Sequence, residues 1–528
     1  MAVTENKTRP RSAKPELHRP VPLAGVLSVW IALLACPAAA LDWQLSPSVG
    51  GSATYTDNAN QSHNDPQDAL ILSVTPGFSL QSQGSRRVQA SMRYGLTGVT
   101  RFGEDNSDDL NHNLGAIGKA ELIEDFLFLD GTASISQELI SLLGSTADAE
   151  INSSNRATVG TYSLSPYIQK RLGTFADAQA RYTTSGAIFE NDVASNSNVN
   201  SFAAGLSSGT RFNNLSWGLN YSIRKADNSA TADTTFERAS ATVGYALTRK
   251  FRVFGTVGQD WNDYLSTSGT SGSSWSAGFG WSPTRRTSVE ASVGERYFGN
   301  TYSLSASHRT RLSQWTVSYA EDVSDITQQL LVANSQTSWV CPVSATKISI
   351  EPVTDPAQPP DPSCQGPYTA RQIINGFNLT AVQAQKLGLT DIALAKGIFI
   401  IKSFNAGVSW DIGRLGFGLS AHDTRRLYQL FGDAQDHVQG VIGSASYRLS
   451  ARTTANSSLS LTRTSTDASL AGGTARDDDL LSLSLGLNHR FAEKLNGALT
   501  LRHTQRDSND ANSDYDENSL SASVNMRF

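Results

Sequence analysis

The last nine residues constrain most strongly what this chain can fold into. Apolar residues alternate there with polar ones: Leu520, Ala522, Val524, Met526 and Phe528 fall on one face, and Ser521, Ser523, Asn525 and Arg527 on the other. Alternation with a period of two is typical of a β-strand with one buried or lipid-facing side. A soluble protein gains nothing by ending on an exposed Phe, whereas a membrane β-barrel can close with such a strand. We therefore predict that the rest of the chain forms one barrel.

The closing strand also resembles the signal by which bacterial outer-membrane proteins are recognised for assembly. In this resemblance Val524, Met526 and Phe528 supply the apolar, lipid-facing positions, with the aromatic residue at the end. It implies two partners, the outer-membrane lipid and the barrel assembly machinery. It also implies that the chain is exported.

The N-terminus agrees with export and predicts a signal peptide over residues 1–40. Basic residues precede an apolar core from Leu23 to Ala35, and Ala38 and Ala40 offer a cleavage point, so that the mature chain begins at Leu41. A transmembrane anchor is the alternative, but the apolar run is short for a hydrocarbon core of about 30 Å. A lipidated Cys36 is a second alternative, which Pro37 and the well-placed alanines disfavour.

Composition separates this chain from helical membrane proteins and from nucleic-acid-binding proteins. The mean hydropathy is −0.29, and no stretch after the signal has eighteen consecutive apolar residues. Only 17% of residues are charged, fewer than the roughly 25% of an average soluble domain. The formal net charge of −5 offers no basic surface for nucleic acid.

From Leu41 to Phe528, segments of about ten residues alternate between apolar and polar positions, the pattern of outer-membrane barrel strands. The connections are alternately long and acidic or short and basic, as expected for extracellular loops and periplasmic turns. Counting segments predicts an all-β fold: a transmembrane antiparallel up-and-down β-barrel of the bacterial outer membrane with about 22 strands, in a range of 18–24. An even number leaves both termini in the periplasm.

Charged residues in the middle of a strand should point into the lumen, because a charge facing lipid near the membrane centre costs about 2–4 kcal/mol. The register places ten arginines and three acids on the inner face or at its mouths: Arg93, Arg101, Arg181, Arg224, Arg238, Arg252, Arg296, Arg490, Arg502, Arg506, Asp177, Asp260 and Glu290. Two interpretations remain open. The arginines pair with acids and brace the wall, or they form a track for an anionic or hydroxyl-rich solute.

Residues 326–397 interrupt the strand pattern and form one partly helical loop insertion. Cys341 and Cys364 bracket a Pro-rich stretch, and a helical sequence follows with Thr380 and Thr390 as candidate N-caps. Because the third cysteine lies in the signal peptide, we predict a periplasmically formed disulfide between Cys341 and Cys364. By strand parity the insertion emerges outside, where it could cap the pore, fold back as a plug, or stand away as a contact surface.

The sequence offers little catalytic chemistry, so we predict no enzymatic activity, no cofactor and no metal. It contains no nucleophile elbow, phosphate-binding glycine loop or Cys-Xaa-Xaa-Cys pair. His422-Asp423 and Ser307-His308 are the local candidates for acid/base work. Adjacent residues of a strand point to opposite faces, so neither pair can act alone as a site.

Several stretches resemble the outer-membrane β-barrels associated with the PEP-CTERM/exosortase system and its exopolysaccharide gene clusters. They run from Trp43 to Asn58, from Val74 to Phe78, from Glu121 to Gln137 and from Ile398 to Lys402. The resemblance spans most of the mature chain and implies a barrel that serves exopolysaccharide biosynthesis or export. It implies polysaccharide and exopolysaccharide export proteins as partners, and it brings no catalytic residues.

Two classes of function follow from the sequence. One is a channel or accessory barrel for exopolysaccharide, and the other is a non-conducting barrel that anchors surface material, or a general porin. A TonB-dependent receptor is disfavoured because the strand pattern begins near Trp43, with no globular segment before it.

Overall fold

The computed structural model describes residues 42–528 apart from 84–86, 104–105, 149, 191–193, 336, 345–346, 353–364, 370–396, 431, 433, 472 and 511. For the described residues between 333 and 369 only the backbone is described, and not the side chains. The predicted signal peptide, the helical sequence after Thr380 and the disulfide between Cys341 and Cys364 lie outside what is described, and they stay predictions.

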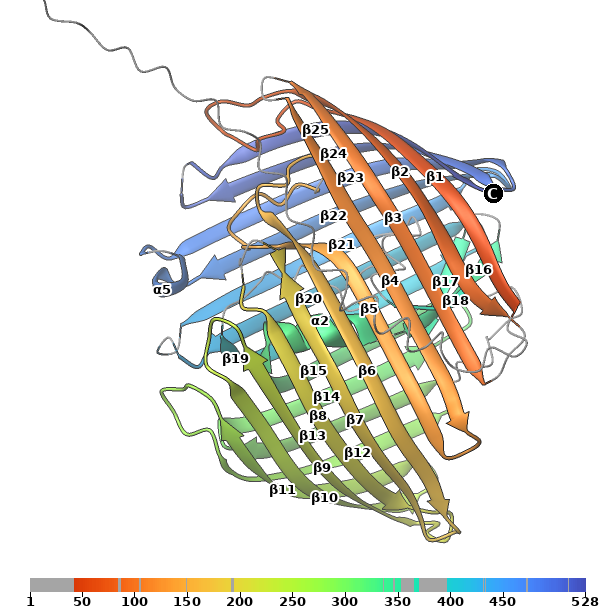
Figure 1. Ribbon diagram of the computed structural model, residues 1–528, viewed down its shortest axis with the longest axis vertical. Helices are drawn as coiled ribbons and strands as arrows, with labels where there is room; N and C mark the ends of the chain where they lie inside the picture. The colour runs from red at the N-terminus through yellow and green to blue at the C-terminus, as the bar shows by residue number, and fades with distance from the viewer. Residues whose placement is uncertain are drawn as a thin grey trace, which may run out of the picture.

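The described strands form a closed antiparallel barrel of 22 strands (Figure 1). Its first half is β1 (Asp42–Thr56), β2 (Ala69–Gln83), β3 (Val88–Gly103), β4 (Ser107–Ile123), β5 (Leu127–Leu139), β6 (Arg156–Leu172), β7 (Ala176–Phe189), β8 (Ser197–Ser208), β9 (Leu215–Asn228), β10 (Thr234–Thr248) and β11 (Phe251–Asp263). Its second half is β12 (Gly272–Thr284), β13 (Thr287–Arg296), β14 (Gly299–Arg309), β15 (Ser313–Asp325), β19 (Ile398–Ile412), β20 (Leu415–Tyr428), β21 (Gln435–Arg448), β22 (Thr453–Thr466), β23 (Arg476–Ala492), β24 (Leu495–Ser508) and β25 (Tyr515–Arg527). The predicted fold class is confirmed.

The barrel closes between its first and last strands. β1 pairs with β25 in antiparallel register, with Tyr55 opposite Leu520, and the backbone amide of Phe528 donates to the carbonyl of Pro47 at 2.9 Å. Closure satisfies the backbone groups of both edges, which lipid could not do. The apolar faces of β25 and of its neighbours point outward, and Phe528 is 57% exposed.

The outer wall is apolar because the outward-facing apolar residues of neighbouring strands lie directly opposite each other. Leu485 of β23 lies opposite Leu501 of β24, and Leu459 of β22 lies opposite Leu483 of β23. The alternate positions carry Ser, Gly, Thr and Asn, which face the lumen. Among the described helices, none is long and apolar enough to cross a membrane.

Several strands are longer than the sequence pattern suggested. The segment from Gly103 to Asp109 has the composition of a long loop, yet β3 extends to Gly103 and β4 begins at Ser107. Charged and polar residues remain in the ladder there because the strand ends rise beyond the lipid, where water solvates the outer face. The connection between β5 and β6 is long, as predicted, and runs from residue 140 to 155.

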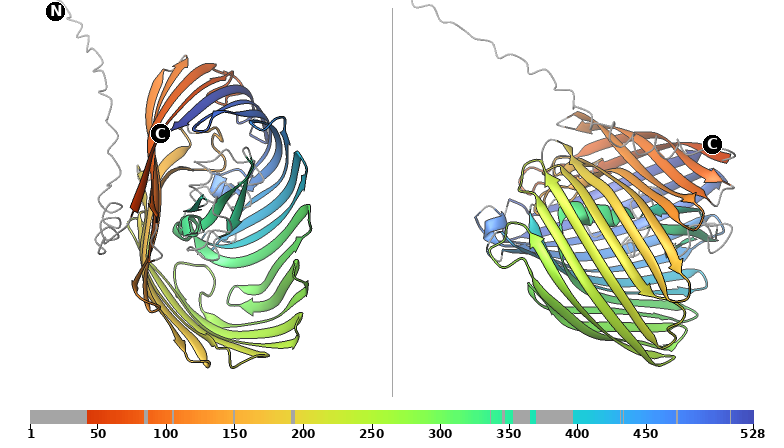
Figure 2. Two further views of the ribbon diagram at one scale, coloured as in Figure 1. Left: turned by 90° about the vertical axis from the view of Figure 1, so that its right-hand side faces the viewer. Right: turned by 60° about the horizontal axis from the view of Figure 1, so that its bottom comes forward.

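The described elements of the insertion after β15 lie inside the barrel. These elements are α2 (Ile326–Ser335) and a small antiparallel sheet of β16 (Thr337–Ser344), β17 (Lys347–Pro352) and β18 (Gln365–Thr369). Figure 2, left, shows this helix and sheet within the ring of strands. Helix α2 contacts β5, β6, β7 and β15, and β18 contacts β3 and β4, so the insertion reaches across the lumen. A short helix α5 (Ala468–Ala471) lies in the loop between β22 and β23.

Candidate functional site

The lumen is the candidate functional site, and the first element within it is the connection from residue 140 to 155, which we call the inner loop. It folds inward rather than away from the barrel. Ala147 and Ile151 of the inner loop pack with Ile71 of β2 and Val99 of β3 in a buried apolar cluster. Ile71 and Val99 are apolar residues on the lumen-facing side of their strands, and the inner loop removes them from water.

Two buried arginines hold the backbone of the inner loop. Arg506 of β24 donates to the carbonyls of Gly144 at 2.8 Å and Leu142 at 3.3 Å, and its guanidinium also pairs with Asp478 of β23. Arg101 of β3 donates through Nε to the carbonyls of residue 150 at 2.8 Å and residue 151 at 3.0 Å, and through Nη1 to Asp109 at 2.7 Å. Carbonyls of a buried loop need donors, and these arginines supply them.

Neutral side chains add further anchors. The side-chain carbonyl of Gln61, in the loop after β1, accepts hydrogen bonds from the Ser145 hydroxyl at 2.8 Å and from the Thr146 amide at 3.1 Å. The amide nitrogen of Gln61 donates to Glu517 of β25 at 2.8 Å. The hydroxyls of Thr146 and Tyr515 are 2.9 Å apart. The inner loop is therefore attached to strands from both ends of the sequence.

Two acids of the inner loop differ in environment. Asp148 pairs with Arg502 at 2.9 Å, and 61% of the Asp148 side chain remains exposed to the water of the lumen. The charge of Arg502 lowers the pKa of Asp148. Burial raises the pKa of Glu150 above its ordinary 4.5, and repulsion by Asp148 adds to the increase, although the hydroxyls of Ser73 and Ser52 and the charge of Arg101 oppose it. The inner loop thus carries one acid that favours ionisation and one that resists it.

Helix α2 is the second element within the lumen. Ile326 and Leu330 pack with Val159, Ala187 and Phe189 on the inner faces of β6 and β7. Its N-terminus is capped by Asp325, whose Oδ1 accepts the backbone amide of Gln328 at 2.9 Å. Arg224 of β9 forms a bidentate pair with the same carboxylate, at 2.6 and 3.2 Å. One acid therefore joins the cap of α2 to a strand far around the ring.

A third cluster lies on β10, β11, β13 and β15, near the end of the barrel that carries the long connections and that the sequence analysis predicts to be extracellular. Asp260, which is almost fully buried, accepts from Arg296 at 3.0 Å and lies 3.9 Å from Arg238. Arg296 also pairs with Asp322 at 2.8 Å. Beside them the hydroxyls of Tyr264 and Tyr297 are 3.1 Å apart, and burial raises the pKa of Tyr297. Two cations and two anions balance each other here.

The remaining predicted residues lie nearer the opposite end, which carries the short turns and is predicted to be periplasmic. Arg181 pairs with Asp130 at 2.9 Å and stacks on Tyr167, with its guanidinium carbon 3.9 Å from the ring centre. Arg252 pairs with Glu290, and Asp177 pairs with Arg171 at 3.2 Å. Arg93 faces the lumen opposite Gly115, and Arg490 faces it at the end of β23.

Eight of the ten predicted arginines thus pair with an acid of the described chain: Arg101, Arg181, Arg224, Arg238, Arg252, Arg296, Arg502 and Arg506. These contacts agree with arginines that brace the wall and hold the lumen elements. A continuous track for solute stays a prediction. The sequence analysis missed Gln61, which binds the inner loop, and it missed most of the acids that pair with these arginines: Asp109, Asp130, Asp148, Asp322, Asp325 and Asp478. Only Asp325 had a usable signal, because Asp325-Ile326-Thr327-Gln328 has the form of a capping box before an apolar run.

The two local acid/base candidates are separated by the strand geometry. His422 is buried on the inner face of β20, while Asp423 lies on the other face and contacts His437 at 2.7 Å. His308 contacts Thr287 at 2.8 Å, away from Ser307. In the described part of the chain no three His, Cys, Asp or Glu side chains gather as metal ligands would.

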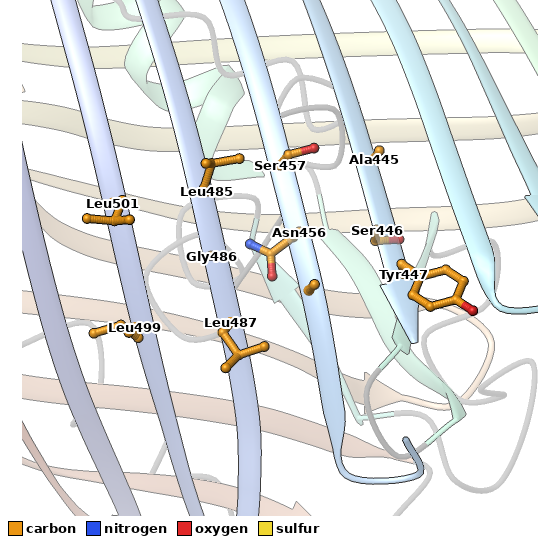
Figure 3. A pocket seen from close by; sticks show the side chains of 11 residues that line it. Ala445, Ser446, Tyr447, Asn456, Ser457, Leu485, Gly486, Leu487, Leu499 and Leu501 are labelled. Atoms are coloured by element: carbon orange, nitrogen blue, oxygen red, sulfur yellow. The ribbon is translucent and has the colours of Figure 1, made fainter. Parts of the chain in front are cut away.

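A shallow groove crosses β21 to β24 on the outer wall (Figure 3). Small residues, Ala445, Ala455 and Ser457, lie there between the larger side chains Tyr447, Leu485, Leu487, Leu499 and Leu501. These residues have the lipid-facing register, so acyl chains would fill the groove. It is separate from the lumen.

Comparison with known proteins finds distant likenesses of structure and no relative by sequence. No family model matches this chain, and no curated protein does. Among solved structures it resembles the siderophore receptor PirA from Pseudomonas aeruginosa, with a TM-score of 0.44 and 9% identity over 92% of this chain and 80% of that one. It resembles PirA from Acinetobacter baumannii (TM-score 0.48, 8% identity, 93% and 81% covered) and the FrpB iron transporter from Neisseria meningitidis (0.48, 10%, 92% and 82%). The resemblance to PEP-CTERM/exosortase-associated barrels stays a prediction.

Proposed function

We propose that this protein is a transport barrel of the outer membrane whose lumen is closed at rest, and that its cargo is exopolysaccharide. The observation that carries the proposal is the occupied lumen. The inner loop and the insertion both fold into the ring and are fastened to its wall by buried contacts. Such elements control passage, and a barrel that only anchors other molecules has no need of them.

The width of the ring supports transport. Barrels of 16–18 strands leave an aqueous channel, and wider ones need a plug to remain closed. A ring of 22 strands therefore encloses more space than its own side chains can fill. The inner loop and the insertion take up this space, and their removal would open a path.

The inner surface supports a hydroxyl-rich cargo. Ser, Thr, Asn and Gly alternate with the outward apolar residues along the strands, and facing hydroxyls bond across strands, as Thr75 does with Thr97 at 2.9 Å and Thr242 with Thr256 at 2.9 Å. Hydroxyl groups exchange hydrogen bonds readily with a sugar chain. The choice of exopolysaccharide among such cargoes rests on the sequence resemblance.

A second candidate is a non-conducting barrel that organises surface material. The observation in its favour is the apolar seal of α2, since Leu330 is 1% exposed against β6 and β7. Moving α2 away from the wall would expose this buried apolar side chain to water and therefore cost free energy. The two candidates differ in whether the lumen ever conducts.

The test is the ionic conductance of the purified full chain in planar bilayers, compared with a variant in which residues 328–396 are replaced by a short Gly/Ser turn. Asp325 and Ile398 are directly paired across β15 and β19, so a short turn can join these strands. We expect a closed or flickering full chain and a steadily conducting variant. The control replaces residues 467–475, a loop with α5 outside the lumen, and should leave conductance unchanged. A folded variant that still does not conduct would favour the non-conducting barrel.

A further inference from the structure

Basic residues face each other across strand pairs at the periplasmic end of the barrel. The backbone amide of Arg309 in β14 donates to the carbonyl of Arg286, just before β13, at 2.8 Å. The amide of Arg448 in β21 donates to the carbonyl of Arg414, just before β20, at 2.9 Å. These bonds place each arginine directly opposite another arginine.

The same arrangement recurs on the next two hairpins. The amide of Arg490 in β23 donates to the carbonyl of Arg452, just before β22, at 2.9 Å. The amide of Arg527 in β25 donates to the carbonyl of Lys494, just before β24, at 3.0 Å. Three of the four pairs therefore lie on consecutive hairpins between β20 and β25. We call the four together the basic pairs.

The register turns the basic pairs toward the lumen. The next residues along the strands, such as Leu415 opposite Tyr447 and Leu495 opposite Met526, belong to the apolar outer wall. Because neighbouring residues of a strand face opposite sides, the basic pairs face inward. Phosphates of the surrounding lipid lie on the other side, which disfavours a phospholipid as the ligand.

The basic pairs carry uncompensated charge. Like charges directly opposite each other in a sheet are destabilising. No acid among the described residues forms an ion pair with any of the eight side chains, whereas arginines at the extracellular end are paired. On the inner face of this region Glu290 is bound to Arg252 and Asp411 lies on β19, and the turn between β23 and β24 carries Glu493 beside Lys494.

We propose that the basic pairs form a binding site for a polyanionic glycan at the periplasmic mouth. This inference rests on the proposed function and names its substrate class: a polysaccharide with carboxylates on its repeating unit, rather than a neutral one. Successive hairpins are separated by two strands, about 10 Å. A polymer with regularly spaced carboxylates neutralises each basic pair in turn, and its many weak contacts add up. Cations at the mouth of a low-dielectric cavity also raise the local concentration of such a polymer.

The experiment titrates the purified full chain in detergent with polygalacturonate oligomers and with dextran of matched length. The test variant carries R286Q, R414Q, R452Q and K494Q, one change in each basic pair. The control carries R211Q, R249Q, R285Q and R311Q, which removes the same charge from exposed turns of the same rim without touching a basic pair. Relief of repulsion should leave the test variant at least as heat-stable as the unchanged protein, which verifies its fold.

We expect the full chain to bind polygalacturonate and not dextran, more weakly at high salt because screening shortens the range of the charges. The test variant should bind about tenfold more weakly, and the control should change by less than about threefold, since exposed pairs contribute little each. Equal losses in both variants, or equal binding of dextran, would overturn the site. Tighter binding of polyglutamate than of polygalacturonate would assign it to an acidic protein instead. If the full chain binds polygalacturonate but the barrel without residues 328–396 does not conduct, the binding site stands and the proposed transport function is rejected.

Discussion

Removing Arg506 should release the inner loop, because this side chain holds two loop carbonyls with a buried charged donor. Arg506 and its partner Asp478 are only 5% and 3% exposed. Each hydrogen bond from a charged donor contributes about 1.5 kcal/mol at the lower end of the usual range, so the R506M substitution should cost the docked loop about 3 kcal/mol. That corresponds to a roughly 150-fold larger population of the open loop.

Arg502 provides the matched comparison, since it lies four positions before Arg506 on the same strand, β24. It pairs with Asp148 of the inner loop, but these two side chains are 40% and 61% exposed. A solvent-exposed pair contributes about 0–1 kcal/mol, so R502M should increase opening by no more than about fivefold.

Hydrogen exchange of the inner-loop amides in the folded barrel measures both effects. The strands should stay protected in each variant, because their ladders are intact. If R502M opened the inner loop as much as R506M does, or if R506M left its exchange unchanged, buried arginine–carbonyl contacts would not be what holds the loop.

Three further outcomes are expected. Deleting Phe528, or replacing it with Asp, should reduce the folded band in heat-modifiability gels, because the closing strand loses its lipid-facing aromatic; unchanged amounts would contradict the assembly signal. Lowering the pH from 7 toward 4.5 should tighten the inner loop, because folding raises the pKa of Glu150. The docked loop is destabilised by the ionised carboxylate at any pH above the folded-state pKa, and this destabilisation disappears once the pH falls below the unfolded-state pKa. The E150Q variant should lack this pH dependence of hydrogen exchange, and a dependence that persisted would assign it elsewhere. Leu330→Ala should loosen α2 by about 2–5 kcal/mol, seen as frequent channel openings, and an unchanged closed state would argue against α2 as the seal.

The sequence by itself determined the wall of the barrel. Whether a strand residue faces lipid or lumen follows from its position in a local alternation, so Leu481, Leu485 and Phe528 could be oriented without any knowledge of their neighbours. The even strand number followed from the alternation of long and short connections, and the inward direction of the charged residues followed from the cost of a charge in lipid. The short basic turns could also be recognised in the sequence. The sequence did not show that their basic residues lie opposite those of the neighbouring strand.

Only the tertiary structure decided what fills the lumen and what the arginines do there. Arg506 and Gly144 are 362 residues apart in the chain, and Arg502 and Asp148 are 354 apart. Closing the ring between β1 and β25 brings such residues together, and no local pattern contains that information. The composition of residues 140–155 indicates a loop, but it would fit a loop outside the barrel equally well. The loop lies inside because Ala147 and Ile151 pack against apolar residues on the inner faces of β2 and β3, and because its carbonyls accept hydrogen bonds from Arg101 of β3 and Arg506 of β24. These partners exist only once the strands are paired, and Arg506 reaches the loop only through closure of the ring.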